Sequence, residues 1–232
     1  MPAGAASEFV EACKEKQVPF VVFVRHASSA PLREGAAARA DKPHDWKIDD
    51  QMRVLTDKGK GQCETAARAW FGALSVRAAL CSPARRASET AMRMTASYET
   101  EENKRETVYL RMVEGVHPAG MSETCESLFE TMGYGPLRTF FEAEGGEDAF
   151  MAYGDAVCAE LTSATLTCSD AAGGGGLAVF GHAVFLNAVA YKVAQAAGAS
   201  EETKRALLDM DLGETQGIHI SLDGGAVAKY PE

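Results

Sequence analysis

The sequence lacks long hydrophobic runs and is poor in positive charge. No stretch of about 18 consecutive apolar residues occurs in the 232-residue chain, so we expect no membrane-spanning helix. The segment from Met1 to Gln17 lacks the basic-then-apolar order of a secretory signal. Acidic residues outnumber basic residues, 33 to 23, which gives a net charge of −10. Such a surface repels nucleic acid and anionic membranes, so we expect neither as a partner. We expect a cytoplasmic protein and leave import into an organelle open.

The chain also lacks recognisable metal-binding and disulfide motifs. Its six cysteines form no Cys-x-x-Cys pair and show no zinc-like spacing with histidine, which favours reduced, buried thiols. No cluster of Asp, Glu and His has the spacing of metal ligands, and the glycine run at 173–176 lacks the spacing of a phosphate-binding loop. We therefore expect neither a metal nor a cofactor.

What the sequence does contain is the pattern of a layered α/β domain. Hydrophobic residues make up 46% and charged residues 24%, as in an ordinary globular protein. Short apolar runs that are typical of strands buried on both faces alternate with helical segments, and Asp223-Gly224-Gly225 is a hairpin turn signal. We predict one domain over 1–232, a three-layer α/β/α sandwich with a mainly parallel central sheet. Residues 1–18 form an N-terminal lead-in, and 114–146 form a small helical cap.

Strands are expected at 19–24, 77–81, 107–110 and 177–180, with a closing pair at 217–222 and 226–229. Three of these runs end in polar residues: Arg25-His26, Ser82-Pro83 and Gly181-His182. Ligands of open α/β sheets bind beyond the carboxyl ends of the strands. The sequence therefore predicts a site where these three strand ends meet.

The residues around these strand ends resemble the motifs of the histidine phosphatase superfamily, the phosphoglycerate mutase-like family. The resemblance covers residues 20 to about 222, and its four motifs occur in family order. They are Arg25-His26-Ala27, Leu55-Thr56-Asp57-Lys58-Gly59, the run from Cys81 to Ala91 in which Arg86 is the matching arginine, and Phe180-Gly181-His182.

This resemblance implies a metal-independent transfer of phosphate through a covalent phosphohistidine at His26. A neutral imidazole is a good nucleophile toward phosphorus near pH 7. The transition state spreads negative charge over the phosphoryl oxygens. By resemblance, Arg25 and Arg86 bind those oxygens and His182 donates a further hydrogen bond. Arg39 and Arg53 are expected to be ordinary surface charge.

The proton donor for the leaving group is the least defined part of the motif set. The family commonly carries a glutamate in a Leu-x-Glu segment after the third strand, where this chain has Leu110-Arg111-Met112. Glu114 is the nearest carboxylate and the expected general acid. Glu123 and His117 are the alternatives.

The loop after His26 bears on the substrate. Mutases of the family continue Arg-His-Gly-Glu-x-x-x-Asn, whereas this chain has Ser28 in place of the glutamate and Leu32 in place of the asparagine. These departures favour hydrolysis of a phosphomonoester or phosphoramidate over mutase-type transfer, and Ser28 and Arg33 are the expected substrate contacts. The expected partner is a phosphorylated small molecule or a phosphohistidine protein. Mutase transfer and phospho-ligand binding without turnover are the alternatives.

Overall fold

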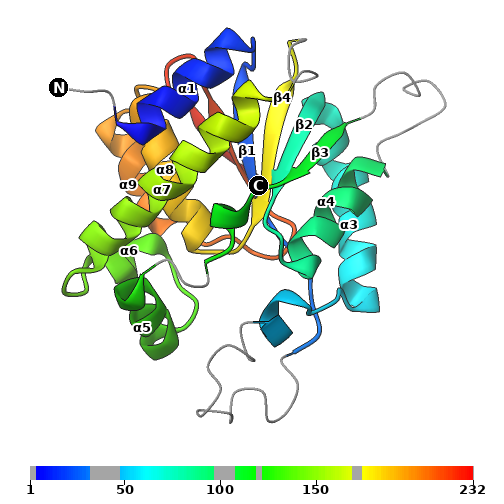
Figure 1. The fold of residues 1–232 in the computed structure, drawn as a ribbon, viewed down its shortest axis with the longest axis horizontal. Coiled ribbons are helices and arrows are strands. Elements are labelled where there is room, and N and C mark those ends of the chain that lie inside the picture. Colours follow the sequence, from blue (N-terminus) through cyan, green and yellow to red (C-terminus); the bar gives the residue numbers. More distant parts are fainter. Residues whose placement is uncertain (1–3, 32–47, 97–107, 119–121, 169–173, 232) are drawn as a thin grey trace.

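The protein is an α/β sandwich built on a six-stranded sheet (Figure 1). The computed structural model describes residues 4–31, 48–96, 108–118, 122–168 and 174–231. In sheet order the strands are β3 (Tyr109–Met112), β2 (Val76–Cys81), β4 (Gly176–Gly181), β1 (Phe20–Arg25), β5 (Gly217–Ser221) and β6 (Val227–Tyr230). The first four are mutually parallel, while β5 runs antiparallel to both of its neighbours, β1 and β6. The predicted fold class, a mainly parallel sheet in an α/β fold, is confirmed.

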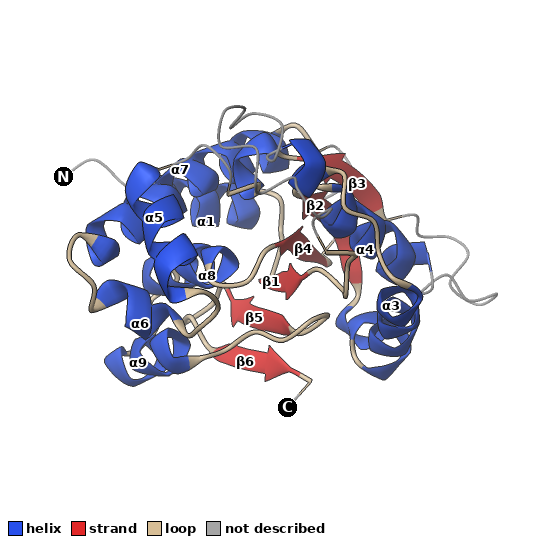
Figure 2. Ribbon diagram, turned by 90° about the horizontal axis from the view of Figure 1, so that it is seen from below, coloured by secondary structure: helices blue, strands red, loops and turns tan. Residues whose placement is uncertain are grey.

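Helices cover both faces of this sheet, as the end-on view in Figure 2 shows. On one face lie α1 (Ala5–Glu15), α7 (Gly146–Leu166), α8 (Phe185–Ala196) and α9 (Glu201–Asp209); on the other lie α3 (Asp57–Ala69) and α4 (Arg85–Ala96).

The apolar run in β1 follows from this double cover. Val21 and Phe23 point into the core beneath α1, α7 and α8, whereas Val22 and Val24 point into the core beneath α3 and α4. Because successive strand residues face opposite sides, a strand buried on both faces must be apolar throughout. The polar residues that follow the run mark the place where the strand leaves the core.

Segment 114–146 contains a short 3-10 turn, η2 (Glu114–Val116), and two helices, α5 (Glu123–Met132) and α6 (Leu137–Phe141). Both helices pack against α7, and α6 also contacts α9. We call α5, α6 and the residues between them the cap. They lie at the carboxyl end of the parallel strands (Figure 1).

Most strand bounds lie within one residue of the predicted ranges, and the third strand differs most. The third strand is Tyr109–Met112, two residues later than expected, because its pairing with Ala78–Cys81 of β2 sets the register. On the other face of the sheet, α3 ends at Ala69 and is followed by a separate 3-10 turn, η1 (Phe71–Leu74).

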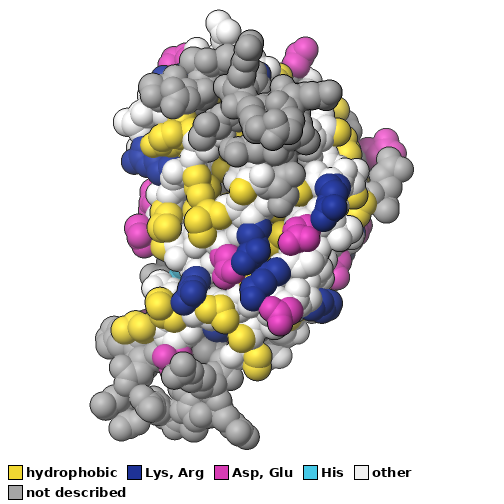
Figure 3. All heavy atoms as spheres, turned by 90° about the vertical axis from the view of Figure 1, so that its right-hand side faces the viewer, with side chains coloured by type: hydrophobic (Ala, Val, Ile, Leu, Met, Phe, Trp, Pro, Cys, Tyr) yellow, Lys and Arg dark blue, Asp and Glu magenta, His cyan; other side chains and the backbone are white. Residues whose placement is uncertain are grey.

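The surface over α3 and α4 mixes charges of both signs. Figure 3 shows Lys and Arg side chains interspersed with Asp and Glu on this side of the molecule. On the face shown, the acidic excess is therefore not gathered into one patch. Within the described ranges, no helix combines the length and hydrophobicity needed to cross a membrane.

Candidate active site

The three polar strand ends meet at the carboxyl edge of the sheet, as predicted. Arg25 pairs with Gly181 in the register of β1 and β4, so His26 and His182 follow on adjacent strands. The ring centroids of the two histidines lie 5.2 Å apart. Ser82 follows β2 on the other side of β4, and its backbone N–H donates to Phe180.

His26 is held in one tautomer by its neighbours. Its Nδ1 lies 2.7 Å from the carbonyl oxygen of Ala27, which can only accept, so Nδ1 carries the proton. The Nε2 lone pair accepts a hydrogen bond from Nε of Arg86 at 3.2 Å. Burial and the charge of Arg86 lower the pKa of His26 to about 3. The ring is therefore neutral near pH 7, with Nε2 directed toward the guanidinium.

His182 is fixed by Arg86 on one side and by Ser82 on the other. Nη2 of Arg86 lies 3.2 Å from Nδ1, and because a guanidinium only donates, Nδ1 must accept. The proton then sits on Nε2, 3.0 Å from the Ser82 hydroxyl oxygen. Burial, followed by the charge of Arg86, holds the pKa of His182 well below its usual range. No role was predicted for Ser82, although the sequence places it directly after a buried strand.

Arg86 is also bound by Asp50, a residue that was not predicted from the sequence. The carboxylate of Asp50 accepts from Nη2 of Arg86 at 2.9 Å, and its backbone carbonyl accepts from Nη1 at 2.6 Å. His117 Nε2 lies 3.7 Å from the same carboxylate. Burial raises the pKa of Asp50, but the interaction with His117 and the charge of Arg86 outweigh it and keep this pKa below its ordinary value. Asp50 is therefore an ionised carboxylate in the pocket that contains His26 and His182.

The expectation that Arg53 is ordinary surface charge was wrong. Its guanidinium lines the pocket and donates to the Asp50 carboxylate at 3.0 Å, and it also binds the Ala30 carbonyl and the Ser29 hydroxyl. It thereby joins the loop after β1 to the segment that carries Asp50.

Arg25 reaches the site less directly than predicted. Its Nη1 donates to the carbonyl of Leu212 at 2.6 Å, and its guanidinium carbon lies 5.0 Å from the centre of the Tyr134 ring. Tyr134 lines the pocket, whereas Arg25 is not among the described residues that line it. In this structure Arg25 contacts the pocket wall through the Tyr134 ring.

The loop after His26 is held by the start of α3. The Ser28 carbonyl accepts from the backbone N–H and the hydroxyl of Thr56, and the Ser28 N–H donates to Gln62. Gly59 packs so closely that an added Cβ would lie 2.0 Å from the Ser28 carbonyl oxygen. This explains the Leu-Thr-x-x-Gly spacing. The predicted substrate contact Ser28 is thus tied through its backbone, and its side chain is not among the described pocket-lining groups.

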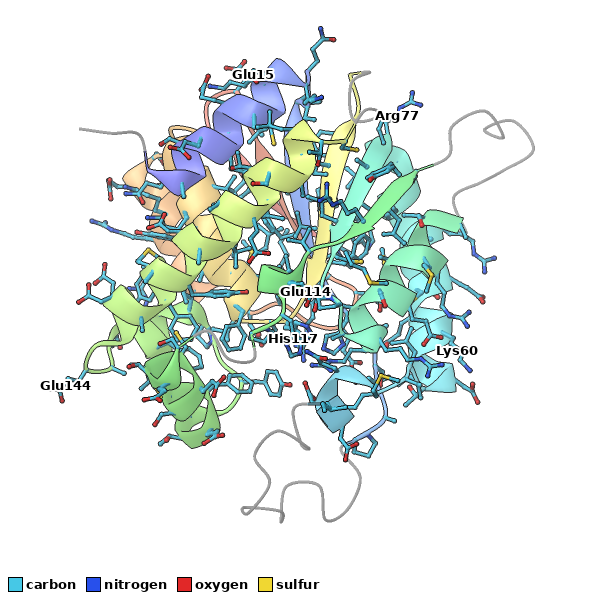
Figure 4. All side chains as sticks on the ribbon, viewed as in Figure 1. Glu15, Lys60, Arg77, Glu114, His117 and Glu144 are labelled. Atoms are coloured by element: carbon cyan, nitrogen blue, oxygen red, sulfur yellow. The ribbon has the colours of Figure 1, made fainter. Side chains whose placement is uncertain are left out.

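The three candidates for the general acid have different positions. Glu114, in η2, is exposed and is not among the described residues that line the pocket, and Glu123 is exposed at the start of α5. His117 is buried, lines the pocket and stacks edge-on against His182 with centroids 5.3 Å apart. Figure 4 labels Glu114 and His117 on the segment after β3. The structure brings His117, and not Glu114, into the pocket with His26 and His182. Arg33, the other predicted substrate contact, and Arg39 lie outside the described residues.

The pocket that contains these groups has a volume of about 530 Å³ and is covered on one side by the cap. Within the part of the chain that the structure describes, no three His, Cys, Asp or Glu side chains are grouped as ligands for a metal ion. The residues that line the pocket are His26, Asp50, Arg53, Arg86, His117, Pro118, Glu126, Phe129, Glu130, Tyr134, His182, Ala183 and Phe185.

Comparisons with known proteins agree with this fold and identify a family. A family model described as histidine phosphatase superfamily (branch 1) matches residues 21–207. A search of curated proteins found no significant match.

Solved structures show a similar fold at low sequence identity. A mycobacterial glucosyl-3-phosphoglycerate phosphatase complexed with VO3 is 13% identical with a TM-score of 0.53, covering 93% of this chain and 99% of that chain. Mycobacterial hydrolase 1 is 15% identical with a TM-score of 0.50, covering 88% and 91%. The protein histidine phosphatase SixA complexed with tungstate is 13% identical with a TM-score of 0.47, covering 90% and 93%.

Proposed function

Because the chain belongs to the histidine phosphatase superfamily, we propose that it is a phosphatase that hydrolyses a phosphomonoester or phosphoramidate through a phosphohistidine at His26. The main observation that supports this proposal is the protonation state and orientation of the His26 ring. Its imidazole is neutral, its Nδ1–H is bound to the Ala27 carbonyl, and its Nε2 lone pair faces the pocket beside Arg86.

In the first step, Nε2 attacks phosphorus in line, the N–P bond forms, and the bond from phosphorus to the leaving oxygen or nitrogen breaks. Arg86 stabilises the charge that spreads over the phosphoryl oxygens. In the second step, water attacks the phosphohistidine, the N–P bond breaks, and inorganic phosphate is released. Both steps require a group that first donates a proton to the leaving atom and then accepts one from water.

His182 supports both steps through its tautomer. While Arg86 is bound to Nδ1, the His182 proton sits on Nε2 toward Ser82. A hydroxyl can donate as well as accept, so Ser82 accommodates either tautomer. When a phosphoryl oxygen replaces the contact with Arg86, a proton on Nδ1 can be donated to that oxygen.

We assign the acid and base role to His117 rather than to Glu114. His117 is the buried member of the three candidates and lines the pocket that contains His26. The Asp50 carboxylate, 3.7 Å from Nε2, orients the ring. His117 thus fills the place that the family's Leu-x-Glu glutamate leaves open in this chain.

A metal is not required by this scheme, since Arg86 supplies the positive charge at the phosphoryl group. A cytoplasmic location is consistent with six free, buried cysteines, which are usual in reducing compartments.

The test is phosphate release from p-nitrophenyl phosphate and from an alkyl phosphate, with chelator present. His26→Ala should abolish release from both, a loss of roughly a thousandfold or more, and should remove the acid-labile phosphoenzyme seen in the wild type. His117→Gln should lower kcat/KM about a hundredfold for the alkyl ester. For p-nitrophenyl phosphate kcat/KM, which reports only the first step, should change little, because p-nitrophenolate leaves without a proton.

Glu114→Gln is the matched control and should leave both rates intact. Equal phosphate release from wild type and His26→Ala would remove the covalent mechanism, and no release from either would favour phospho-ligand binding without turnover. Activity lost to the chelator and restored by a divalent ion would overturn the metal-independent scheme.

A further inference from the structure

The peptide group between Ala27 and Ser28 lies between the His26 ring and the side chain of Gln62. Its carbonyl oxygen accepts a hydrogen bond from Nδ1 of His26 at 2.7 Å. Its N–H donates to Oε1 of Gln62 at 2.9 Å. Because a trans peptide group is planar and its C=O and N–H point in opposite directions, a contact that fixes the N–H also fixes the carbonyl. The hydrogen bond to Gln62 therefore directs the carbonyl toward His26.

The Gln62 amide is itself held by Glu214. Nε2 of Gln62 donates to the Glu214 carboxylate at 2.9 Å. A backbone N–H only donates and an ionised carboxylate only accepts, so Oε1 must face Ser28 and Nε2 must face Glu214. Burial raises the pKa of Glu214, but the hydrogen bond from Gln62 and the charge of Lys58 outweigh it and keep this pKa below its ordinary value. The chain of hydrogen bonds that starts at His26 therefore ends on a negative charge.

All donors in this chain of hydrogen bonds point away from the ring. The ring donates to the Ala27 carbonyl, the N–H of the same peptide group donates to Gln62, and Gln62 donates to Glu214. Hydrogen bonds that are aligned in this way polarise one another. They favour a proton on Nδ1 of His26, and they stabilise the positive charge that the ring acquires when Nε2 bonds to phosphorus.

Glu214 lies next to residues that bind the backbone of Arg25. The N–H of Thr215 donates to the Arg25 carbonyl at 3.1 Å, and the N–H of Arg25 donates to the Gln216 carbonyl at 3.0 Å. Segment 214–216 is therefore fixed to the strand end directly before His26. The hydrogen bonds from Glu214 thus connect the residues before the nucleophile with the peptide group after it.

We infer that Gln62 and Glu214 are positioning residues for the nucleophile, which hold His26 in its Nδ1–H tautomer through the Ala27–Ser28 peptide group and direct its Nε2 lone pair toward phosphorus. The inference rests on the proposed function, in which His26 attacks phosphorus. Neither residue is among the described residues that line the pocket, so both act through the peptide group and not on the substrate.

Three variants test this chain of hydrogen bonds through kcat/KM for p-nitrophenyl phosphate, which reports the attack of His26. Gln62→Met removes the acceptor for the Ser28 N–H and should lower kcat/KM about tenfold. Glu214→Gln keeps a hydrogen bond but removes the charge, and it should lower kcat/KM about fivefold. Adding Gln62→Glu to Glu214→Gln returns a carboxylate to the chain, so this double variant should recover to within about twofold of the wild type.

Two results would overturn the inference. One is a wild-type kcat/KM in Gln62→Met, and the other is a double variant that is no faster than Glu214→Gln. If Gln62→Met does not fold, as urea titration would show, the comparison of Glu214→Gln with the double variant still decides.

Phosphate binding separates positioning from a general loosening of the site. The affinity for inorganic phosphate, measured by calorimetry, should change by less than about twofold in these variants, because the hydrogen bonds act on the His26 ring and not on the Arg86 guanidinium. A fall in affinity equal to the fall in kcat/KM would show a merely structural role and reject the inference.

Lys58→Gln is the matched control. Lys58 is largely exposed, donates to the same Glu214 carboxylate at 3.4 Å and lies outside the chain of hydrogen bonds. The loss of its charge should therefore leave kcat/KM unchanged.

The ring nitrogens of His26 give a readout that does not depend on turnover. NMR should show Nδ1 protonated and Nε2 unprotonated in the wild type, a smaller difference between the two in Gln62→Met and Glu214→Gln, and recovery in the double variant. These shifts without any phosphate release would retain the positioning residues and reject the phosphatase function. Phosphate release that is lost in His26→Ala, combined with ring nitrogens that are the same in every variant, would do the reverse.

Discussion

Arg86 contacts four groups at once: His26, His182, and both the carbonyl and the carboxylate of Asp50. These contacts use four of its five N–H groups, so a phosphoryl group that binds the guanidinium through two oxygens must replace at least one of them. The Asp50 carboxylate is the contact that carries negative charge, so a phosphate dianion repels it while it competes for the same donors. Asp50 therefore acts as an internal competitor for the anion.

Asp50→Asn should tighten binding of inorganic phosphate. The substitution removes the like charge but keeps a side chain of the same size, and a gain of about fivefold in affinity is expected. Isothermal calorimetry measures it directly. Asp49→Asn is the control, because Asp49 is adjacent and is not among the described residues lining the pocket. Unchanged or weaker phosphate binding by Asp50→Asn would show that Asp50 mainly positions Arg86.

At the scale of elements, the junction between α3 and the loop after β1 places the nucleophile. Gly59 lies against the Ser28 carbonyl oxygen, 2.0 Å from where a Cβ would stand, whereas a Cβ at Gly61 would have no heavy atom within 4 Å. The two glycines lie on the same helix and differ in this contact.

Gly59→Ala should therefore lower the free energy of unfolding by about 2 kcal/mol or more, because the loop after His26 must move. It should also reduce kcat. Gly61→Ala should raise the free energy of unfolding by about 0.5–1 kcal/mol, since alanine is the better helix former. Urea titration of both variants tests the pair, and a neutral effect of Gly59→Ala would mean that the contact with Ser28 relaxes at little cost.

The strand ends were predictable because a sharp change from apolar to polar residues marks each of them. Asp50 and Arg53 were not predictable as site residues, because they lie just after a polar loop without periodicity. Only the fold brings that segment close to His26. Whether Glu114 or His117 is the general acid also could not be predicted from the sequence. They lie three positions apart in the sequence, and which one enters the pocket depends on the 3-10 turn Glu114–Val116.

At the scale of the molecule, we propose that residues 1–232 unfold as one unit. The sheet is buried on both faces, and the cap helices pack on α7, which belongs to the same core as β1. Urea unfolding should then show one transition, the same by circular dichroism and by fluorescence.

Buried histidines make this stability depend on pH. The pKa of His26 is about 3 in the folded chain and near 6.5 when unfolded, so between these values the unfolded state binds a proton that the folded state does not. The contribution of His26 to the free energy of unfolding is present above pH 6.5 and is lost as the pH falls toward 3. For His26 the loss is about 2 kcal/mol between pH 7 and pH 5. His182 acts in the same direction.

Urea titrations at pH 7, 6 and 5 should show this loss in the wild type and a shallower dependence in His26→Gln. If both proteins lose stability equally over this interval, His26 titrates in the folded chain near its ordinary value.

The six buried thiols have a consequence for following motion in this molecule. A maleimide can reach a buried cysteine only when the surrounding structure opens, so the rate of labelling reports the rate or frequency of that opening. Cys125 lies in the cap, Cys13 in the outer helix α1, and Cys81 at the end of β2 beside the site. The native cysteines thus report local opening separately in the cap, the helical layer and the sheet, without any engineered probe.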